Sequence, residues 1–153
     1  MSSTPKVNQS NFIQAEDIRG MIEDESPEDN PLHMDVYFSE EKIHRAMRNA
    51  AMRWNAIPPI GVGSVQDPFR LPFGSAKSSI FIEGVLFYLY RSAVSRLKRN
   101  DITYDAGGVT TNIKKDLINH FDAMRMEHWE NFQSGVHEHK VSQNIRASYR
   151  CLG

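Results

Sequence analysis

The sequence predicts a mainly α-helical protein, a small bundle of about three main helices with long loops, extended N- and C-terminal arms and at most minor β-structure. Apolar residues recur at helical spacing in three segments, residues 40–56, 76–99 and 112–135. The connections between these segments hold four of the seven prolines and five of the nine glycines, which favour turns over helices. Residues 34–38 alternate in the manner of a short strand, so the expected β-structure is small.

The first 35 residues are predicted to form an acidic arm and linker. Eight acidic and two basic residues give this segment a net charge of −6, whereas the remaining 118 of the 153 residues carry +5. Such an arm either docks on a basic surface, of its own chain or of a neighbour, or extends as a solvated tail. Within it, the apolar residues between Phe12 and Ile22 are compatible with one or two helical turns, and residues 25–31 read as a proline-containing linker.

The helix expected at residues 40–56 has the clearest local signals. Ser39 is a good N-cap, and Glu40 and Glu41 suit the positive end of the helix dipole. Apolar residues from Ile43 to Trp54 form one face. The pair Pro58-Pro59 ends the helix, because proline cannot donate the next backbone hydrogen bond.

The helix expected at residues 76–99 organises the fold. Nine of the eleven residues from Ile80 to Tyr90 are apolar or aromatic, which predicts cover on several sides. Three helices do not easily hide such a helix within one protomer, so we expect cover from neighbouring copies, or else from the proline-rich loop at residues 57–76. That loop carries apolar residues at intervals, which indicates that it packs.

The last helix is expected at residues 112–135, with an apolar stripe from Ile113 to Val136. Gly135 is predicted to weaken or end it. The sequence thus divides into an acidic arm and linker (1–35), a helical domain (36–136) and a polar C-terminal tail (137–153).

The expected compartment follows from the single cysteine and from the lack of a signal-peptide pattern or a long apolar window in the sequence. Cys151 is the only cysteine, so no internal disulfide forms, which fits a reducing compartment. The N-terminal residues lack the pattern of a signal peptide, and no apolar window is long enough to span a bilayer. We expect assembly in a cytosol.

Catalytic and metal-binding patterns are weak. His137 and His139 flank Glu138, a spacing that shares a face on a strand and not on a helix, and a zinc site needs about three or four ligands. Glu83, inside the apolar helix, is either a catalytic acid with a raised pKa or, as we favour, a structural group paired with an arginine across an interface. We therefore expect no enzyme, no metal and no cofactor.

A basic cluster marks the end of the central helix and leads into a glycine-rich loop. Cations in the last turns suit the negative end of a helix dipole, and a nearby tyrosine gives the mixed character of a nucleic-acid surface. Acidic residues beside the cluster offset part of its charge. The candidate interface or channel residues are Arg91, Arg96, Lys98, Arg99, Asp101, Tyr104, Gly107 and Gly108.

Four short motifs resemble small virion structural proteins of tailed bacteriophages. They are residues 38–43 (Phe-Ser-Glu-Glu-Lys-Ile), 54–59 (Trp-Asn-Ala-Ile-Pro-Pro), 91–93 (Arg-Ser-Ala) and 99–108 (Arg-Asn-Asp-Ile-Thr-Tyr-Asp-Ala-Gly-Gly). Their order and spacing, over roughly residues 36–146, are similar to those of neck or head–tail connector (adaptor) proteins. The resemblance implies a non-enzymatic, mainly helical subunit that forms an oligomeric ring between portal and tail, around the channel through which the genome passes.

Two hypotheses follow. The first is a structural ring subunit of a phage virion, assembled in the host cytoplasm, with copies of itself and portal, tail or other neck proteins as partners and with DNA only in non-specific proximity. The alternative is a helical nucleic-acid-binding or regulatory module that uses the basic end of the central helix. A membrane partner is not expected under either hypothesis.

Overall fold

The computed structural model describes residues 11–22, 38–101 and 111–151. Within these ranges the chain forms four α-helices and one short 3-10 helix. The prediction of a mainly helical bundle is therefore confirmed. The elements are α1 (Ala15–Met21), α2 (Glu40–Ala56), η1 (Pro68–Arg70), α3 (Ala76–Asp101) and α4 (Thr111–Arg150).

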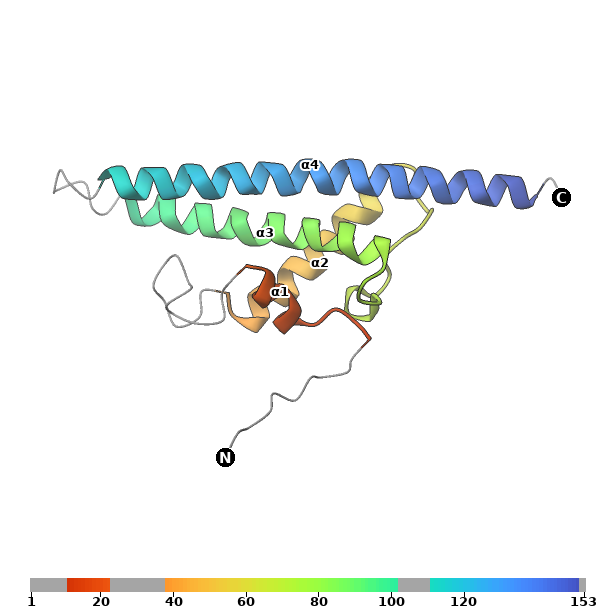
Figure 1. Ribbon diagram of the computed structural model, residues 1–153, viewed down its shortest axis with the longest axis horizontal. Helices are drawn as coiled ribbons and strands as arrows, with labels where there is room; N and C mark the ends of the chain where they lie inside the picture. The colour runs from red at the N-terminus through yellow and green to blue at the C-terminus, as the bar shows by residue number, and fades with distance from the viewer. Residues whose placement is uncertain (1–10, 23–37, 102–110, 152–153) are drawn as a thin grey trace, which may run out of the picture.

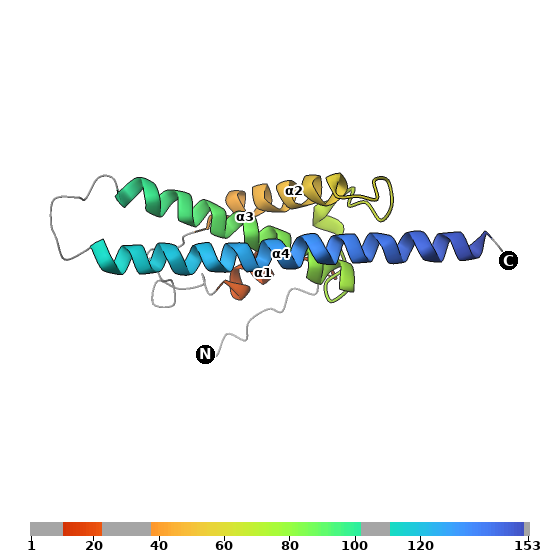
Figure 2. The same cartoon turned by 90° about the horizontal axis from the view of Figure 1, so that it is seen from above.

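The two long helices form the frame of the molecule. Helices α3 and α4 run antiparallel and side by side along the length of α3 (Figures 1 and 2). Helix α2 packs against α3, and α1 packs against α2. The core lies where these helices meet, and Trp54, Phe81 and Phe132 are its largest fully buried apolar side chains.

Helix α2 has the predicted bounds for the predicted reasons. Ser39 caps it, because its Oγ accepts a hydrogen bond from the Lys42 amide at 3.4 Å. The buried face contains Ile43, Met47 and Trp54, at helical spacing. The strand expected at residues 34–38 lies outside the described residues except for Phe38, which is buried.

Helix α3 is covered within one protomer, so the expectation that neighbouring copies supply its cover is wrong. Phe81, Val85 and Leu89 are almost completely inaccessible in the single chain. Helices α2 and α4 supply most of the cover, because α4 is long enough to follow α3 from end to end. The loop at residues 57–75 contributes the buried Val65 and Leu71.

Helix α4 continues well past Gly135 to Arg150, so the predicted end of the last helix at residue 135 is wrong, and most of the predicted polar C-terminal tail belongs to this helix. A methyl group added at Gly135 would lie 3.0 Å from Ile80 of α3, and one added at Gly84 would lie 2.6 Å from the Phe132 ring. Both glycines therefore occupy points where α3 and α4 approach closely. Their function is helix–helix contact, and the cost of glycine inside a helix is offset by packing.

Residues 11–22 belong to the folded body, which corrects the assignment of all of residues 1–35 to an arm. Ile13 and Ile18 are buried, and the Ile13 amide donates to the Leu71 carbonyl at 3.0 Å. The Arg19 guanidinium donates to the Phe38 carbonyl at 3.2 Å and so holds α1 beside the start of α2. Residues 1–10 and 23–37 lie outside the described ranges.

Candidate functional site

The sequence-predicted site does not form a pocket in the described part of the chain. Arg91, Arg96, Lys98 and Arg99 are all exposed on the last turns of α3. Asp101 is the final residue of α3, and Tyr104, Gly107 and Gly108 lie outside the described residues. The structure therefore places these four cations on the exposed surface of the last turns of α3.

Glu83 is paired with a histidine within the protomer, which corrects the prediction of an arginine partner across an interface. His128 Nδ1 of α4 lies 2.7 Å from Glu83 Oε2, and the Asn131 amide donates to the same oxygen at 3.4 Å. The hydrogen bond with His128 holds the pKa of Glu83 below its ordinary value, more than burial raises it. Tyr90 stacks on the His128 ring at 5.4 Å. Glu83 thus links α3 to α4 and lacks the raised pKa of a general acid.

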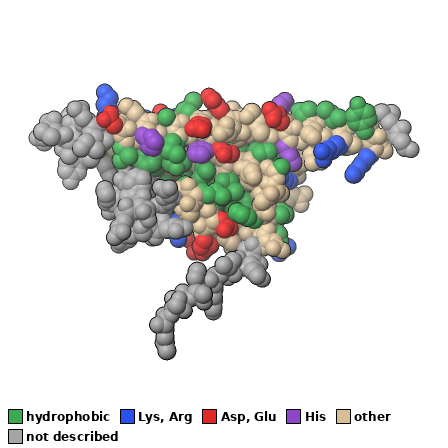
Figure 3. All heavy atoms as spheres, in the orientation of Figure 1, with side chains coloured by type: hydrophobic (Ala, Val, Ile, Leu, Met, Phe, Trp, Pro, Cys, Tyr) green, Lys and Arg blue, Asp and Glu red, His purple; other side chains and the backbone are tan. Residues whose placement is uncertain are grey.

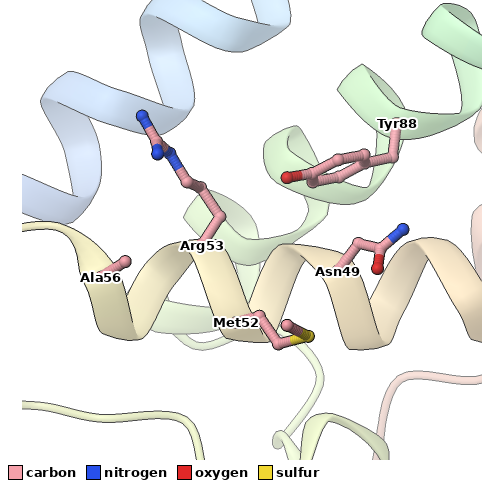
Figure 4. Close-up of a pocket in the computed structure, with 5 residues that line it drawn as sticks. All are labelled: Asn49, Met52, Arg53, Ala56 and Tyr88. Carbon is pink, nitrogen blue, oxygen red and sulfur yellow. The ribbon is translucent and has the colours of Figure 1, made fainter.

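A shallow hollow of about 360 Å³ lies between α2 and α3. Asn49, Met52, Arg53 and Ala56 from α2 and Tyr88 from α3 line it (Figure 4). The Arg53 guanidinium extends toward α4 and lies 5.0 Å from the centre of the Trp129 ring. The hollow brings together no nucleophile and base, so it fits a contact surface better than a catalytic site.

The end of α4 extends beyond the rest of the bundle. Both views show its last turns without a neighbouring element (Figures 1 and 2), and every residue from 142 to 150 is exposed. We call residues 142–150 the α4 overhang. Ile145 and Tyr149, four residues apart, are 51% and 73% exposed and continue a face that begins at the half-buried Val141. Apolar and basic side chains are visible along this end of the helix (Figure 3).

A groove of about 640 Å³ lies at the root of the overhang, between the start of α3 and α4. We call it the basic groove, because it brings together Lys77, His139 and Arg146. Ser75 and Gln143 add polar groups, Ile80 adds an apolar surface, and Glu138 is its one carboxylate. The other lining residues are Ala76, Gly135 and Ser142.

The cations of the basic groove raise one another's electrostatic energy. Burial lowers the pKa of His139 first, and the positive charges of Lys77 and Arg146 lower it further. Burial also lowers the pKa of Lys77, whose Nζ donates to the Ser64 carbonyl at 2.8 Å and lies 5.7 Å from the centre of the Trp54 ring. Burial disfavours a charge of either sign, whereas the positive charges of Lys77 and Arg146 beside His139 favour an anion there.

Lys140 fixes the wall behind the groove. Its side chain is fully buried, and its Nζ donates to the carbonyls of Trp54 and Ile57 at 2.7 and 2.6 Å. These carbonyls lie at the C-terminal end of α2, where a cation is stabilised by the helix dipole. Burial lowers the pKa of Lys140, and Lys77 lowers it further. Lys140 thereby holds α4, and with it His139, against α2.

Sequence reasoning missed the basic groove. Its members come from two segments about sixty residues apart in the chain, and five of them fall in the predicted C-terminal tail at residues 137–153. The available signal was the continued helical spacing of Phe132, Val136 and Lys140, all on the buried face of α4.

Metal, membrane and family comparisons give no assignment. The described residues contain no group of three or more His, Cys, Asp or Glu side chains that could hold a metal ion. None of the helices in the described ranges has the length and apolar character needed to cross a membrane. A scan against protein-family models and searches of curated proteins and of solved structures found no match for this chain.

Proposed function

We propose that this chain is a non-enzymatic structural subunit of a tailed-phage virion, of the neck or head–tail connector type, that forms a ring of identical copies around the DNA channel. The motifs at residues 38–59 and 91–108 supply the phage assignment by resemblance. The α4 overhang carries the argument for assembly, because it is a helical surface that its own protomer leaves uncovered.

The overhang supports assembly on energetic grounds. The overhang continues a helix that is already nucleated, but each further residue adds little stability in water without tertiary packing. Its exposed Ile145 and Tyr149 provide an apolar stripe that a second surface can bury. Copies related by rotation, each placing its overhang on the next, form a closed ring when the rotation closes.

The experiment is a mass measurement of the purified chain over its full soluble concentration range, followed by electron microscopy of the assembled material. We expect multimers of fixed size in the wild type. The double variant Ile145→Asp/Tyr149→Asp should remain monomeric with unchanged helical content. The control variant Ile60→Asp alters a side chain that is 75% exposed in the loop and should assemble normally. A wild type that stays monomeric at every concentration contradicts the proposal.

Nucleic-acid binding is the second candidate function. It is favoured by the exposure of Arg91, Arg96, Lys98 and Arg99 on the last turns of α3. A monomer that binds duplex DNA through four such contacts should lose affinity with a log–log salt slope of about −3.6, roughly 0.9 per phosphate contact. Charge reversal at Lys98 and Arg99 should flatten that slope if this candidate is right, and should leave assembly intact.

A further inference from the structure

We infer that the basic groove binds the acidic segment Glu23–Asp29 of a second copy of this chain. The inference rests on the proposed self-assembly and names the contact that forms it. The segment Glu-Asp-Glu-Ser-Pro-Glu-Asp carries five carboxylates and no cation. The groove and the overhang carry Lys77, His139, Arg146 and Arg150, and the sequence has no acidic residue after Glu138. The two surfaces are therefore complementary in charge.

The groove has unused capacity for carboxylates. The Lys77 ammonium has three N–H groups, and the Ser64 carbonyl accepts from it. Arg146 is exposed on α4 and presents a planar fork that matches a carboxylate. Ser75 and Gln143 offer further polar groups, and Ile80 gives the apolar contact that a proline-containing peptide needs.

The charged groups facing the groove from both helices favour a peptide over nucleic acid. Lys77 comes from α3, and Glu138, His139 and Arg146 come from α4, while the Lys140 ammonium behind them is directed to the carbonyls at the end of α2. Two full positive charges beside one carboxylate are few for a duplex, since DNA-binding proteins commonly neutralise several phosphates. They suit a short acidic peptide better.

Chain length places the contact between copies. Residues 23–37 leave the body after Ile22 and return at Phe38, and the bond from Arg19 to the Phe38 carbonyl holds both ends together at the start of α2. Because both ends of this fifteen-residue segment are anchored, the chain must run out and back, so even when fully extended it reaches only about 25 Å from its anchors. Helix α2 alone spans about 25 Å, and its far end contacts Lys140. Arg146 lies almost two turns further along α4, which leaves no chain for docking on the same copy.

The resulting contact joins two different surfaces, one end of a subunit to the opposite end of the next. Contacts of this head-to-tail type generate rings or filaments instead of closed dimers. They also allow a complementation test that docking within one copy cannot pass. One variant keeps the groove and loses the segment, and the other keeps the segment and loses the groove.

The segment variant replaces Glu23, Asp24, Glu25, Glu28 and Asp29 by the corresponding amides. The groove variant is Arg146→Glu, and Lys115→Glu is its control, because Lys115 is an exposed cation near the other end of α4. We expect wild type and control to assemble and each test variant alone to be monomeric. A mixture of the two test variants should give a 1:1 heterodimer, because one intact groove meets one intact segment. Assembly of both test variants like the wild type overturns the inference and leaves the proposed function standing.

A binding measurement separates the inference from the proposed function if the wild type does not assemble. The receptor is the full-length segment variant, whose groove is intact and whose own segment is neutral. The probes are a labelled peptide of residues 21–31, its amide counterpart and a single-stranded oligonucleotide. We expect the acidic peptide to bind, and Arg146→Glu to weaken it by at least about tenfold, as for a lost charge-assisted hydrogen bond. Oligonucleotide binding that depends on Arg146, without peptide binding, overturns the inference in favour of nucleic acid.

Discussion

Gly84 contacts Phe132 across the interface between α3 and α4. We therefore expect Gly84→Ala to destabilise the protein when Phe132 is present and to stabilise it when Phe132 is replaced by alanine. Phe132 is fully buried, and the centre of its ring lies 6.2 Å from that of Trp54 and 6.1 Å from that of Trp129. A methyl group at Gly84 would lie 2.6, 2.7 and 3.0 Å from three atoms of the Phe132 ring. The ring has little room to move away, so α3 and α4 must separate or the ring must leave its rotamer.

The magnitudes follow from two opposing terms. Overpacking a well-packed core costs ~1–3 kcal/mol, whereas replacing glycine by alanine inside a helix gains ~1 kcal/mol. Gly84→Ala alone should therefore destabilise the protein by up to ~2 kcal/mol. Phe132→Ala alone should cost ~3–5 kcal/mol, because it leaves a cavity. In that background the clash is gone, and Gly84→Ala should stabilise the protein by ~1 kcal/mol or more, since the methyl group also fills part of the cavity.

The assay is chemical denaturation of the four proteins, followed by circular dichroism and by tryptophan fluorescence, at a concentration where all have the same mass. The double-mutant cycle gives the coupling free energy directly. Ser92→Ala, on an exposed position of α3, serves as the control and should be additive with Phe132→Ala. Equal effects of Gly84→Ala in both backgrounds would show that the two helices do not meet at this point.

Three further outcomes test the remaining corrections. Ile18→Ala should lower the free energy of unfolding by ~2–5 kcal/mol in denaturation experiments, because α1 belongs to the core. An unchanged free energy of unfolding would show instead that residues 11–22 belong to the arm. Lys140→Met should destabilise by ~1–3 kcal/mol, since it leaves the buried Ile57 carbonyl without this donor. Glu83 has a lowered pKa, so its pairing stabilises the fold above the unfolded pKa of glutamate and is lost as pH falls through the folded value. His128→Ala should therefore flatten the acid side of the stability profile, and an unchanged profile would contradict the pairing.

Much of the fold was predictable where local chemistry decides it. The bounds of α2 follow from the Ser39 cap and the Pro58-Pro59 stop, and both signals are local. The start of α3 and its apolar centre were predicted in the same way. Of the large apolar side chains on the predicted helices, Trp54, Leu86, Leu89 and Phe121 are buried, whereas Trp129 is half-buried, with the Arg53 guanidinium 5.0 Å from the centre of its ring.

The failures share a physical cause, because they depend on partners distant in the sequence. Gly135 reads as a helix stop until Ile80 is known to lie against it. Residues 11–22 read as part of an acidic arm until Leu71 is known to bind their backbone. Glu83 was expected to meet an arginine, and the pairing with His128 became visible only once α3 and α4 were set antiparallel.

The candidate site shows the same limit more sharply. A run of cations such as Arg96, Lys98 and Arg99 is conspicuous in a sequence, yet the described structure leaves these side chains exposed on a single helix. Lys77 and Arg146 are inconspicuous in the sequence, and the antiparallel pairing of two helices brings them to one groove. Contiguous charge in a sequence therefore does not reveal which distant cations the fold brings together.

The length of α4 connects the fold to assembly. Its 40 residues span about 60 Å, whereas the 26 residues of α3 span about 39 Å, so α3 leaves roughly 20 Å of α4 without a partner along its length. The turns beside α3 are fixed by buried side chains such as Phe132 and Val136, and the last buried residue is Lys140. Beyond it, no described residue of the helix is buried, so its stability there depends mainly on its own backbone hydrogen bonds, which add little per residue. A neighbouring copy that covers Ile145 and Tyr149 would therefore stabilise the helix and the interface together.

Backbone amides of residues 142–150 should exchange rapidly with solvent in the monomer and become protected on assembly, while those around Val136 should be protected in both states. Equal protection of the overhang in monomer and multimer would place the interface elsewhere.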